Sequence, residues 1–215
     1  MERKLWKKGC KHVACLDEAG RGPLAGPVVA AACTIINCKL KTVDFKDLKD
    51  SKKLSPKRRE KFYKIITRNK NIEWGIGKVS ERVIDKINIL EASKLAMRKA
   101  IAKLKEKPDF LILDGKMKLD LPACGERNRT IPQKSIVKAD EKVFSCTCAS
   151  ILAKVTRDKI MERYHKKYPR YVLNKHKGYP TKLHLRMLRK YGPCKIHRRS
   201  FEPVRTCKTK RTVVR

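Results

Sequence analysis

The stretch from residue 12 to residue 36 restricts the fold of this chain more than any other part of the sequence. A short apolar run, His12 to Asp17, ends in the acidic pair formed by Asp17 and Glu18. Glycines and prolines interrupt Gly20 to Pro27, and an apolar, partly β-branched run from Val28 to Ile36 follows. Runs of this kind bounded by turn residues are typical of strands. The segment therefore predicts two paired strands joined by an elaborate turn, with carboxylates at the end of the first strand.

The remainder of the chain alternates between helix and strand patterns. Ser55 and Pro56 are typical of the N-cap and first position of a helix, here reaching Thr67. Strands are expected at Ile72 to Val79, Phe110 to Leu113 and Ile131 to Lys138, and further helices at Ile84 to Lys105, Lys142 to about Lys167, and Lys182 to Lys190. This order predicts an α/β fold in which helices cover a mixed sheet.

Two of the expected helices carry a recognisable face. In the helix from Ile84, apolar residues at a 3.6-residue period are expected to share one side: Ile87, Leu90, Met97, Ile101 and Leu104. In the helix from Lys142, a face of small and apolar residues is expected to pack on the sheet: Ala149, Leu152, Ala153, Thr156 and Ile160.

The charge of the chain indicates a polyanionic partner. Lysine and arginine number 56 against 21 acidic residues, which gives a net charge of +35 over 215 residues. Such a field attracts nucleic acid, although membrane lipid or acidic protein would satisfy the charge alone. No apolar run approaches the length of a membrane-spanning helix, and no signal peptide is apparent, so we expect a cytoplasmic, monomeric protein without a membrane partner.

Cysteine usage gives no sign of a disulfide framework. The count of nine is odd and the spacing is loose. Cys146 and Cys148 are interpreted as small buried hydrophobic residues, with a zinc site as the alternative.

Acidic residues are scarce, so their positions carry information. Asp17 and Glu18 end one expected strand, Asp114 ends another, and Asp140 lies just ahead of a helix. Sites in α/β sheets gather at strand ends, and clustered carboxylates require cations; hard oxygen ligands favour Mg²⁺ or Mn²⁺. Two such ions can serve phosphodiester cleavage. The alternative is that Asp114 forms a turn and Asp140 caps a helix.

Several segments resemble ribonuclease HII, in family order from about residue 12 to residue 205. The most specific is the run Cys15 to Val29, which contains Asp17-Glu18-Ala19-Gly20-Arg21-Gly22. The other matching segments are Asp50 to Ser55, Asn88 to Leu90 with Ala96-Met97, Leu113 to Gly115, Val137 to Asp140, Ala149 to Asp158, His176 to Thr181, and His197 to Phe201.

The resemblance implies an architecture and a set of functional residues. It implies a ribonuclease H-like core over about residues 12–170, a C-terminal helical substrate-binding part over about 171–205, and a basic tail over 206–215, together forming one ribonuclease HII-type domain. The metal-binding, catalytic carboxylates would be Asp17, Glu18, Asp114 and Asp140, and the substrate-binding residues Gly20, Arg21, Gly22, Lys52 and Tyr179.

The same resemblance implies an endonuclease that hydrolyses the RNA strand of RNA–DNA hybrids. It would also cut on the 5′ side of ribonucleotides embedded in duplex DNA, leaving 3′-hydroxyl and 5′-phosphate ends, as needed for ribonucleotide excision in DNA replication and repair. Glycines at positions 20 and 22 would let the backbone approach the sugar and test for its 2′-hydroxyl. Arg21 could hold a phosphate. The ring of Tyr179 could pack on the deoxyribose beyond the junction between the ribonucleotide and the DNA that follows it. Without the resemblance, Tyr179 would be interpreted as a partly buried core residue.

The chain departs from the family pattern at Ala139, where the family usually has glycine, and the stretch Lys116 to Arg129 matches weakly. Because alanine restricts φ, the carboxylate of Asp140 could be displaced. One alternative is therefore an inactive basic binding protein on the same scaffold. A second alternative, which the sequence disfavours, is the sibling ribonuclease HIII. The sibling usually carries an extra N-terminal domain and a lysine in the glycine loop, where this chain has Arg21.

Overall fold

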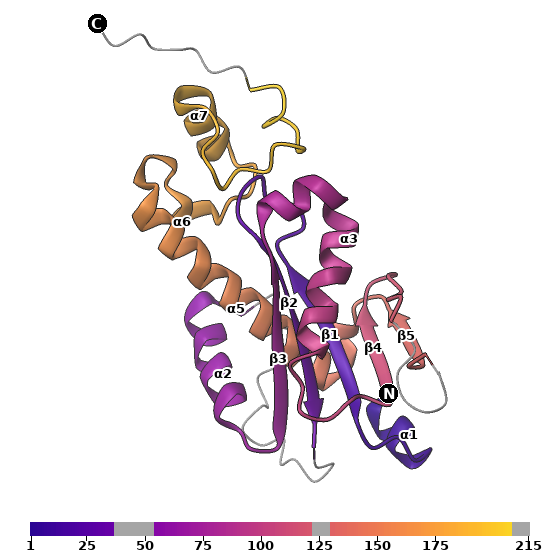
Figure 1. Ribbon diagram of the computed structural model, residues 1–215. Helices are drawn as coiled ribbons and strands as arrows, with labels where there is room; N and C mark the ends of the chain where they lie inside the picture. Colours follow the sequence, from indigo (N-terminus) through magenta and orange to yellow (C-terminus); the bar gives the residue numbers. More distant parts are fainter. Residues whose placement is uncertain (37–53, 122–129, 208–215) are drawn as a thin grey trace, which may run out of the picture.

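A mixed five-stranded sheet forms the centre of the computed structural model, which describes residues 1–36, 54–121 and 130–207 (Figure 1). The strand order is β3-β2-β1-β4-β5. The first three strands along the chain pair antiparallel, and β4 and β5 join β1 in parallel. The bounds are β1 Val13–Ala19, β2 Val28–Ile35, β3 Ile72–Val79, β4 Phe110–Asp114 and β5 Gln133–Ile136. The predicted α/β class with a mixed sheet is confirmed.

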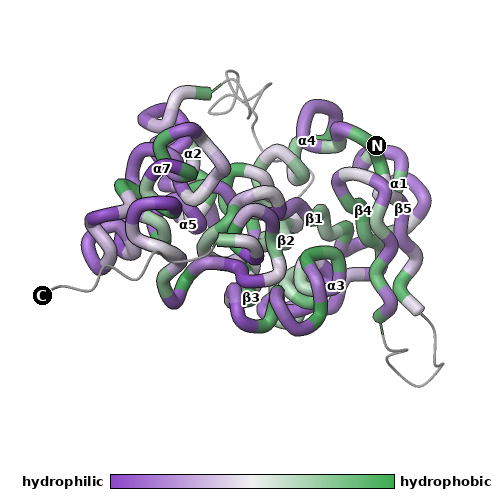
Figure 2. Tube along the Cα trace, turned by 90° about the horizontal axis from the view of Figure 1, so that it is seen from above, coloured by the Kyte–Doolittle hydropathy of each residue, from purple (hydrophilic) through white to green (hydrophobic). Residues whose placement is uncertain are grey.

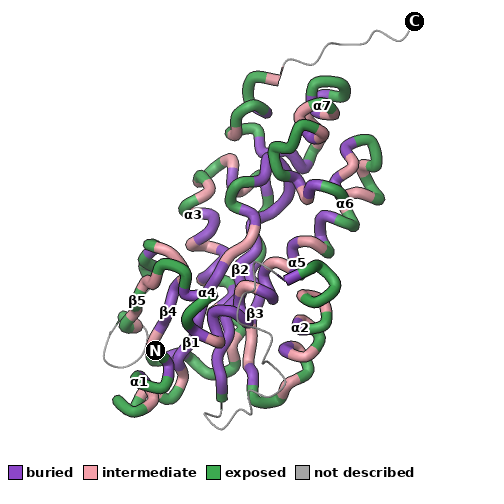
Figure 3. The backbone as a smooth tube through the Cα atoms, turned by 180° about the vertical axis from the view of Figure 1, so that it is seen from behind, coloured by how far each residue is buried: buried purple, intermediate pink, exposed green. Residues whose placement is uncertain are grey.

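Helices cover both faces of the sheet. On one face lies α5 (Phe144–Lys167) with α2 (Pro56–Arg68) outside it, and on the other lies α3 (Glu81–Ile101) (Figure 1). Alternate residues of β2 point into the two layers, Val29, Ala31 and Cys33 toward α5 and the intervening ones toward α3. Burial on both faces explains why β2 is a continuous apolar run rather than an alternating one. The burial map shows the same central strands enclosed by more exposed helices (Figure 3).

The helix α3 approaches the sheet unusually closely because two glycines of β3 lie beneath it. A Cβ atom on Gly77 would lie 1.8 Å from the carbonyl oxygen of Ala96, and one on Gly75 would lie 2.2 Å from that of Ala100. Both distances are far below van der Waals contact, so only glycine fits at these positions.

Of the five residues predicted to share an apolar face of this helix, Leu90 is exposed, while Ile87, Met97, Ile101 and Leu104 pack on one core cluster. Asn88 adopts φ 62° and ψ 170°, which kinks α3, and its side-chain oxygen accepts hydrogen bonds from the backbone nitrogens of Leu90 and Glu91. Leu90 lies in the capped turn that follows the kink and is 41% exposed. The fully buried residues of α3 are Glu81, Ile84, Ala92, Ser93, Ala96, Met97 and Ala100.

Other predicted elements hold with shifted ends. Ser55 caps α2 through a hydrogen bond from the backbone nitrogen of Arg58, and β3 has its predicted bounds. The last parallel strand is shorter than predicted. The helix predicted from Lys142 begins at Phe144 and is preceded by the short helix α4 (Ala139–Lys142). Cys146 and Cys148 are fully buried, as predicted.

The C-terminal part packs at one end of the sheet, beyond the end of α5 (Figure 1). It consists of the 3-10 helix η2 (Pro169–Tyr171) and the helices α6 (Leu173–His176) and α7 (Lys182–Tyr191). Backbone hydrogen bonds attach it to the turn between β1 and β2: the nitrogen of Leu24 donates to Gly178, and that of Gly26 to Ile196. The elaborate turn predicted at 20–27 is therefore the docking site of the C-terminal part.

At the opposite end of the molecule, α1 (Glu2–Lys7) packs beside β1. Its buried Glu2 accepts a hydrogen bond from Ser145. Polar residues dominate the outer surfaces of the helices, while apolar residues gather around the central strands (Figure 2). None of the helices in the described ranges has the length and apolar character required to cross a bilayer.

Candidate active site

The parallel pairing of β1 and β4 brings the first carboxylates together. Leu16 pairs with Leu113, so Asp17 and Asp114, which follow them, emerge as neighbours at the same edge of the sheet. Glu18 is next along β1. This is the meeting of strand ends that the sequence predicts.

An open pocket of about 430 Å³ lies at this edge. It is bounded by the ends of β1 and β4, the loop that follows β1, α2, α5 and the loop before α7. The lining residues are Asp17, Glu18, Ala19, Gly20, Arg21, Gly22, Arg59, Asp114, Ser150, Ile151, Lys154 and Tyr179. Three of the four predicted carboxylates and four of the five predicted substrate-binding residues therefore line one pocket.

Burial and mutual repulsion make these carboxylates difficult to ionise. Burial, followed by the charges of Glu18 and Asp114, raises the pKa of Asp17 well above its ordinary value, although a hydrogen bond with Ser150 opposes the shift. Burial also raises the pKa of Glu18, against the opposing effect of Arg21. A bound cation would stabilise the charged form of these clustered carboxylates.

The fourth predicted carboxylate lies behind this pocket rather than in its lining. Asp140 is fully buried in α4. The backbone nitrogen of the preceding Ala139 donates a 2.7 Å hydrogen bond to Oδ1 of Asp114, which ties the two acidic segments together.

The departure from the family pattern at Ala139 causes no backbone strain. The residue with positive φ at this turn is Lys138, at 59°, and Ala139 already lies in helical conformation and is fully buried. Alanine at position 139 therefore does not displace Asp140 through a restricted φ, because the positive φ of this turn is at Lys138.

The glycine–arginine–glycine loop has two differently constrained glycines. Gly20 has φ +100°, and a Cβ there would lie 2.2 Å from Nε of Arg157 and 2.8 Å from the carbonyl oxygen of Pro27. A Cβ on Gly22 would meet only the ring of Tyr179, at 3.7 Å. Packing within the protein therefore requires glycine at position 20 but not at position 22, where the open space faces the pocket.

Between these glycines, the side chain of Arg21 is about half exposed and forms a 3.2 Å ion pair with Glu18. The predicted phosphate-binding arginine is thus oriented by one of the carboxylates at the mouth of the pocket.

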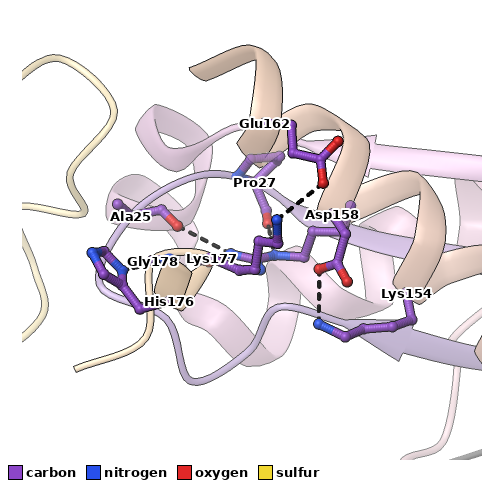
Figure 4. Close-up of polar contacts among 9 residues, drawn as sticks. Ala25, Pro27, Lys154, Asp158, Glu162, His176, Lys177 and Gly178 are labelled. Atoms are coloured by element: carbon purple, nitrogen blue, oxygen red, sulfur yellow. Dashed lines mark hydrogen bonds and ion pairs between the residues drawn. The ribbon is translucent and has the colours of Figure 1, made fainter. Parts of the chain in front are cut away.

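Two buried arginines hold the loop from below, and sequence reasoning assigned them no role. The guanidinium group of Arg198 donates to the carbonyl oxygens of Gly20, Arg21 and Gly26 at 2.6–3.0 Å. Arg157 on α5 donates to the carbonyl oxygens of Ala25, Pro27 and Lys177 at 3.0–3.1 Å. Figure 4 labels these three acceptor residues. Burial lowers the pKa of both arginines, to about 9 for Arg198. Their donors fix the path of the loop against α5 and the C-terminal part.

Tyr179 follows Gly178, whose φ of +87° and close approach to Ala25 place the loop against the turn after β1. The Tyr179 ring is 40% exposed, so the alternative of a partly buried core residue is not what the structure shows. The cations of Lys154 and Arg157 lie 6.0 Å and 5.8 Å from its centroid. Lys154 is held by a 2.8 Å ion pair with Asp158 one turn along α5 (Figure 4).

The pocket also contains residues that the sequence did not single out, namely Arg59, Ser150 and Lys154. Ser150, Lys154 and Arg157 follow one another at spacings of four and three, so they share one face of α5. That spacing was a usable signal. Lys52, the remaining predicted substrate-binding residue, lies outside the described residues.

The donor chemistry of the pocket fits divalent cations, but the side chains are not gathered around an ion. Carboxylate oxygens are the ligands that Mg²⁺ and Mn²⁺ prefer, and burial together with the charges of Glu18 and Asp114 raises the pKa of Asp17. Among the described residues, no three histidine, cysteine or acidic side chains are close enough to hold one ion together as they stand. Metal ligation by these four residues stays a prediction.

Comparison with known proteins connects this pocket to a family. The family model for ribonuclease HII matches residues 14–204. A ribonuclease HII from Chlamydia caviae is 48% identical over 204 residues, which cover 95% of this chain and 90% of that relative. A ribonuclease HII from Caldanaerobacter subterraneus is 49% identical over 200 residues, covering 93% and 78%.

Solved structures agree with these sequence relatives. The crystal structure of ribonuclease H2 from Pyrococcus horikoshii is 28% identical, has a TM-score of 0.69, and is matched over 91% of this chain and 96% of its own. A Bst ribonuclease HIII, solved in complex with Mn²⁺, is 17% identical with a TM-score of 0.66, covers 91% of this chain and 68% of its own, and shares the fold. The sequence resemblance is thereby confirmed: the chain belongs to the ribonuclease HII family and is a hydrolase, an endonuclease of the ribonuclease H type.

Proposed function

We propose that this protein cuts the RNA strand of RNA–DNA hybrids and incises duplex DNA on the 5′ side of embedded ribonucleotides, leaving 3′-hydroxyl and 5′-phosphate ends. The observation that carries the proposal is the shared pocket: Asp17, Glu18 and Asp114 line it together with the loop 20–22 and Tyr179. Groups suited to cations and groups suited to reading a sugar thus face the same space.

The carboxylates are proposed to hold two Mg²⁺ or Mn²⁺ ions, with Asp140 joining from behind Asp114. When bound, the ions supply activation of water and neutralisation of charge at the scissile phosphate. Asp17 is the central ligand of the proposal, because it is buried beside both Glu18 and Asp114, and burial followed by their charges raises its pKa. The hydrogen bond from Ser150 holds its carboxylate toward the pocket.

Recognition of the ribonucleotide is proposed to fall to the loop and the tyrosine. The uncrowded space at Gly22 lets a sugar reach the backbone, whose polar groups can test for a 2′-hydroxyl. The ring of Tyr179, adjacent to Gly22, can pack on the next sugar. Arg21, Arg59 and Lys154 line the pocket and supply positive charge for the neighbouring phosphates. Lys52 is proposed to bind phosphate as well.

The binding-only alternative required Ala139 to displace an acidic residue. The hydrogen bond from Ala139 to Asp114 and its helical conformation remove that reason. Catalysis is therefore the function that the pocket supports better.

The test is cleavage of duplex DNA that contains one ribonucleotide, with Mg²⁺ or Mn²⁺, and mapping of both product ends on a sequencing gel. Wild-type protein is expected to nick once, on the 5′ side of the ribonucleotide. Asp17→Asn is expected to bind the same duplex but to lose nearly all cleavage. Equal cleavage by this variant and wild type would refute the assignment of Asp17.

Tyr179→Ala is the complementary variant, because it leaves the carboxylates in place. It is expected to reduce cutting at the single ribonucleotide more than cutting of a continuous hybrid. Unchanged cutting at the single ribonucleotide would remove Tyr179 from the recognition site.

A further inference from the structure

A buried row of polar groups leads from Cys194 to the backbone of Tyr179. The backbone nitrogen of Cys194 lies 3.0 Å from Nδ1 of His197, and Nε2 of His197 lies 3.1 Å from Nε2 of His184. Nδ1 of His184 then lies 2.9 Å from the carbonyl oxygen of Tyr179. The exposed fraction is 0% for His184 and 2% for His197, so water does not mediate these contacts.

The two ends of this row fix where each proton lies. A carbonyl oxygen only accepts, so His184 must donate from Nδ1 to Tyr179. A backbone N–H only donates, so His197 must accept from Cys194 at Nδ1. His197 therefore carries its proton on Nε2 and donates it to the unprotonated Nε2 of His184. The contacts specify one tautomer for each ring and one direction for the row.

A charged ring is excluded at either position by the same contacts. An added proton on His197 would face the backbone N–H of Cys194, and one on His184 would face the N–H of His197. Burial and the nearby His176 lower the pKa of His184 to about 4, and burial and His184 lower the pKa of His197 to about 3, so both rings are neutral at ordinary pH.

The row ends at the residue proposed to read the junction. The carbonyl oxygen of Tyr179 receives a second hydrogen bond, 2.8 Å long, from the backbone nitrogen of Thr181. Thr181 in turn caps α7, and the ring of His184 stacks on His176 at 4.3 Å. The carbonyl group of Tyr179 thus accepts hydrogen bonds from two donors, while its side chain lines the pocket.

We propose that His184 and His197 are positioning residues for junction recognition: His197 imposes the tautomer of His184 that donates to the Tyr179 carbonyl, and this bond aims the Tyr179 ring at the sugar beyond the ribonucleotide. The inference rests on the proposed role of Tyr179. It goes further by assigning specificity to two buried histidines that do not line the pocket.

Two substitutions at His184 separate positioning from packing. In His184→Asn the amide nitrogen takes the place of Nδ1 and keeps a donor for Tyr179. In His184→Gln the amide reaches the place of Nε2 and keeps only the contact with His197. The measured quantity is kcat/KM on duplex DNA with one ribonucleotide divided by kcat/KM on a hybrid with a continuous RNA strand.

The ratio for His184→Asn is expected to stay within about twofold of wild type, whereas His184→Gln is expected to lower it by about fivefold to tenfold, the loss of one hydrogen bond. The same ratio in both variants would overturn the proposal, because a purely structural role does not distinguish the two ends of the ring.

A second measurement needs neither variant nor substrate. Nitrogen-15 NMR of the histidine rings in the wild-type protein reports which ring nitrogen carries the proton. A proton on Nδ1 of His184 and on Nε2 of His197 is the expected result, and the opposite tautomer on His184 would overturn the inference. If wild-type protein cuts the continuous hybrid but not the single ribonucleotide, the proposed junction function fails, and the NMR result alone decides the hydrogen-bonded row.

Discussion

Gly20 and Gly22 look equivalent in the sequence but have different roles in the structure. A side chain at position 20 meets Arg157 and the carbonyl of Pro27 in a left-handed backbone, whereas a side chain at position 22 meets only the Tyr179 ring at 3.7 Å. The first glycine serves the fold and the second leaves room at the pocket.

Alanine at each position should separate these roles. Gly20→Ala is expected to lower the free energy of unfolding by about 2 kcal/mol, because of backbone strain and overlap with buried atoms. Gly22→Ala should melt like wild type yet cut poorly at a single ribonucleotide, since its methyl group would occupy the space proposed for the sugar. Thermal denaturation and the gel assay measure the two effects; normal cleavage by a stable Gly22→Ala protein would contradict the role given to this position.

A substitution at Asp17 should likewise affect stability and metal binding in opposite directions. Its burial beside Glu18 and Asp114 makes the charged form unfavourable in the folded protein without metal. Asp17→Asn is therefore expected to raise the melting temperature of the metal-free protein. Added Mn²⁺ should raise the melting temperature of wild type and have a smaller effect on the variant. Equal Mn²⁺ shifts in both proteins would place the ions elsewhere.

Some site residues could be predicted from the pattern of their own strand, and others could not because their contacts are distant in the sequence. Asp17, Glu18 and Asp114 were predictable because each ends an apolar strand, and strand ends meet at one edge of a sheet. Arg198 and His197 were not, because their roles depend on carbonyl groups and rings far away in the sequence. The Arg198 guanidinium binds a loop more than 170 positions earlier. No spacing rule within one element reports such a contact.

At the scale of elements, the contact between α3 and β3 depends on glycine. Gly75 and Gly77 allow the helix backbone to approach the strand, and Ala96 and Ala100 form the opposing surface. The sequence pattern indicated a strand from Ile72 to Val79 but gave no reason for glycine there, since that reason lies on another element.

Gly77→Ala is expected to destabilise the protein by about 2–3 kcal/mol, because the added methyl group overlaps the carbonyl of Ala96 and forces α3 outward. Lys78→Ala, whose exposed side chain lies on the same strand, should change the free energy of unfolding by less than about 0.5 kcal/mol. Urea denaturation compares the two variants. Similar free energies of unfolding for the two variants would contradict this expectation, because α3 would then accommodate the methyl group without loss of stability.

The helix α3 also shows where periodicity fails as a guide. A single 3.6-residue pattern from Ile84 onward assumed a continuous helix, but Asn88 breaks the hydrogen-bond ladder and caps the second segment with its own side chain. Asparagine tolerates positive φ, which makes such an interruption possible. Ile84 and Ile87 before the kink and Met97 after it still pack on one core cluster, and the residue that departs from the pattern is Leu90, in the capped turn.

For the whole molecule, the question is how firmly the C-terminal part is attached to the core. Arg157 and Arg198, the bridge between Ala25 and His197, and the hydrogen bond from Leu24 to Gly178 all join the two. We propose that the core over about residues 12–170 and the part over about 171–205 unfold in one transition.

The buried histidines give that attachment a pH dependence. The folded protein keeps His184 and His197 neutral down to pKa values of about 4 and 3, while the unfolded chain takes up protons below about pH 6.5. Their contribution to stability is fully present above about pH 6.5 and is lost as the pH falls toward 3. Urea unfolding across this range should show a steeper acid loss for wild type than for His197→Gln, and parallel curves would contradict the depressed pKa of His197.

The net charge of +35 was the easiest property to interpret from the sequence, and it restricts the partner to a polyanion without saying which. The choice of an RNA-containing duplex comes from the pocket and the family instead. Fold class, most strand positions and three of the pocket's carboxylates followed from local patterns. The attachment of the C-terminal part and the tautomers within it required the folded chain.

The most direct test of the account is a crystal structure of the protein with Mn²⁺, located by its anomalous scattering. Manganese is expected between the carboxylates of Asp17, Glu18 and Asp114, with these side chains drawn toward the ion. Asp140 is expected next to Asp114, on the side away from the pocket. Manganese bound elsewhere, with none in this pocket at saturating concentration, would contradict the account.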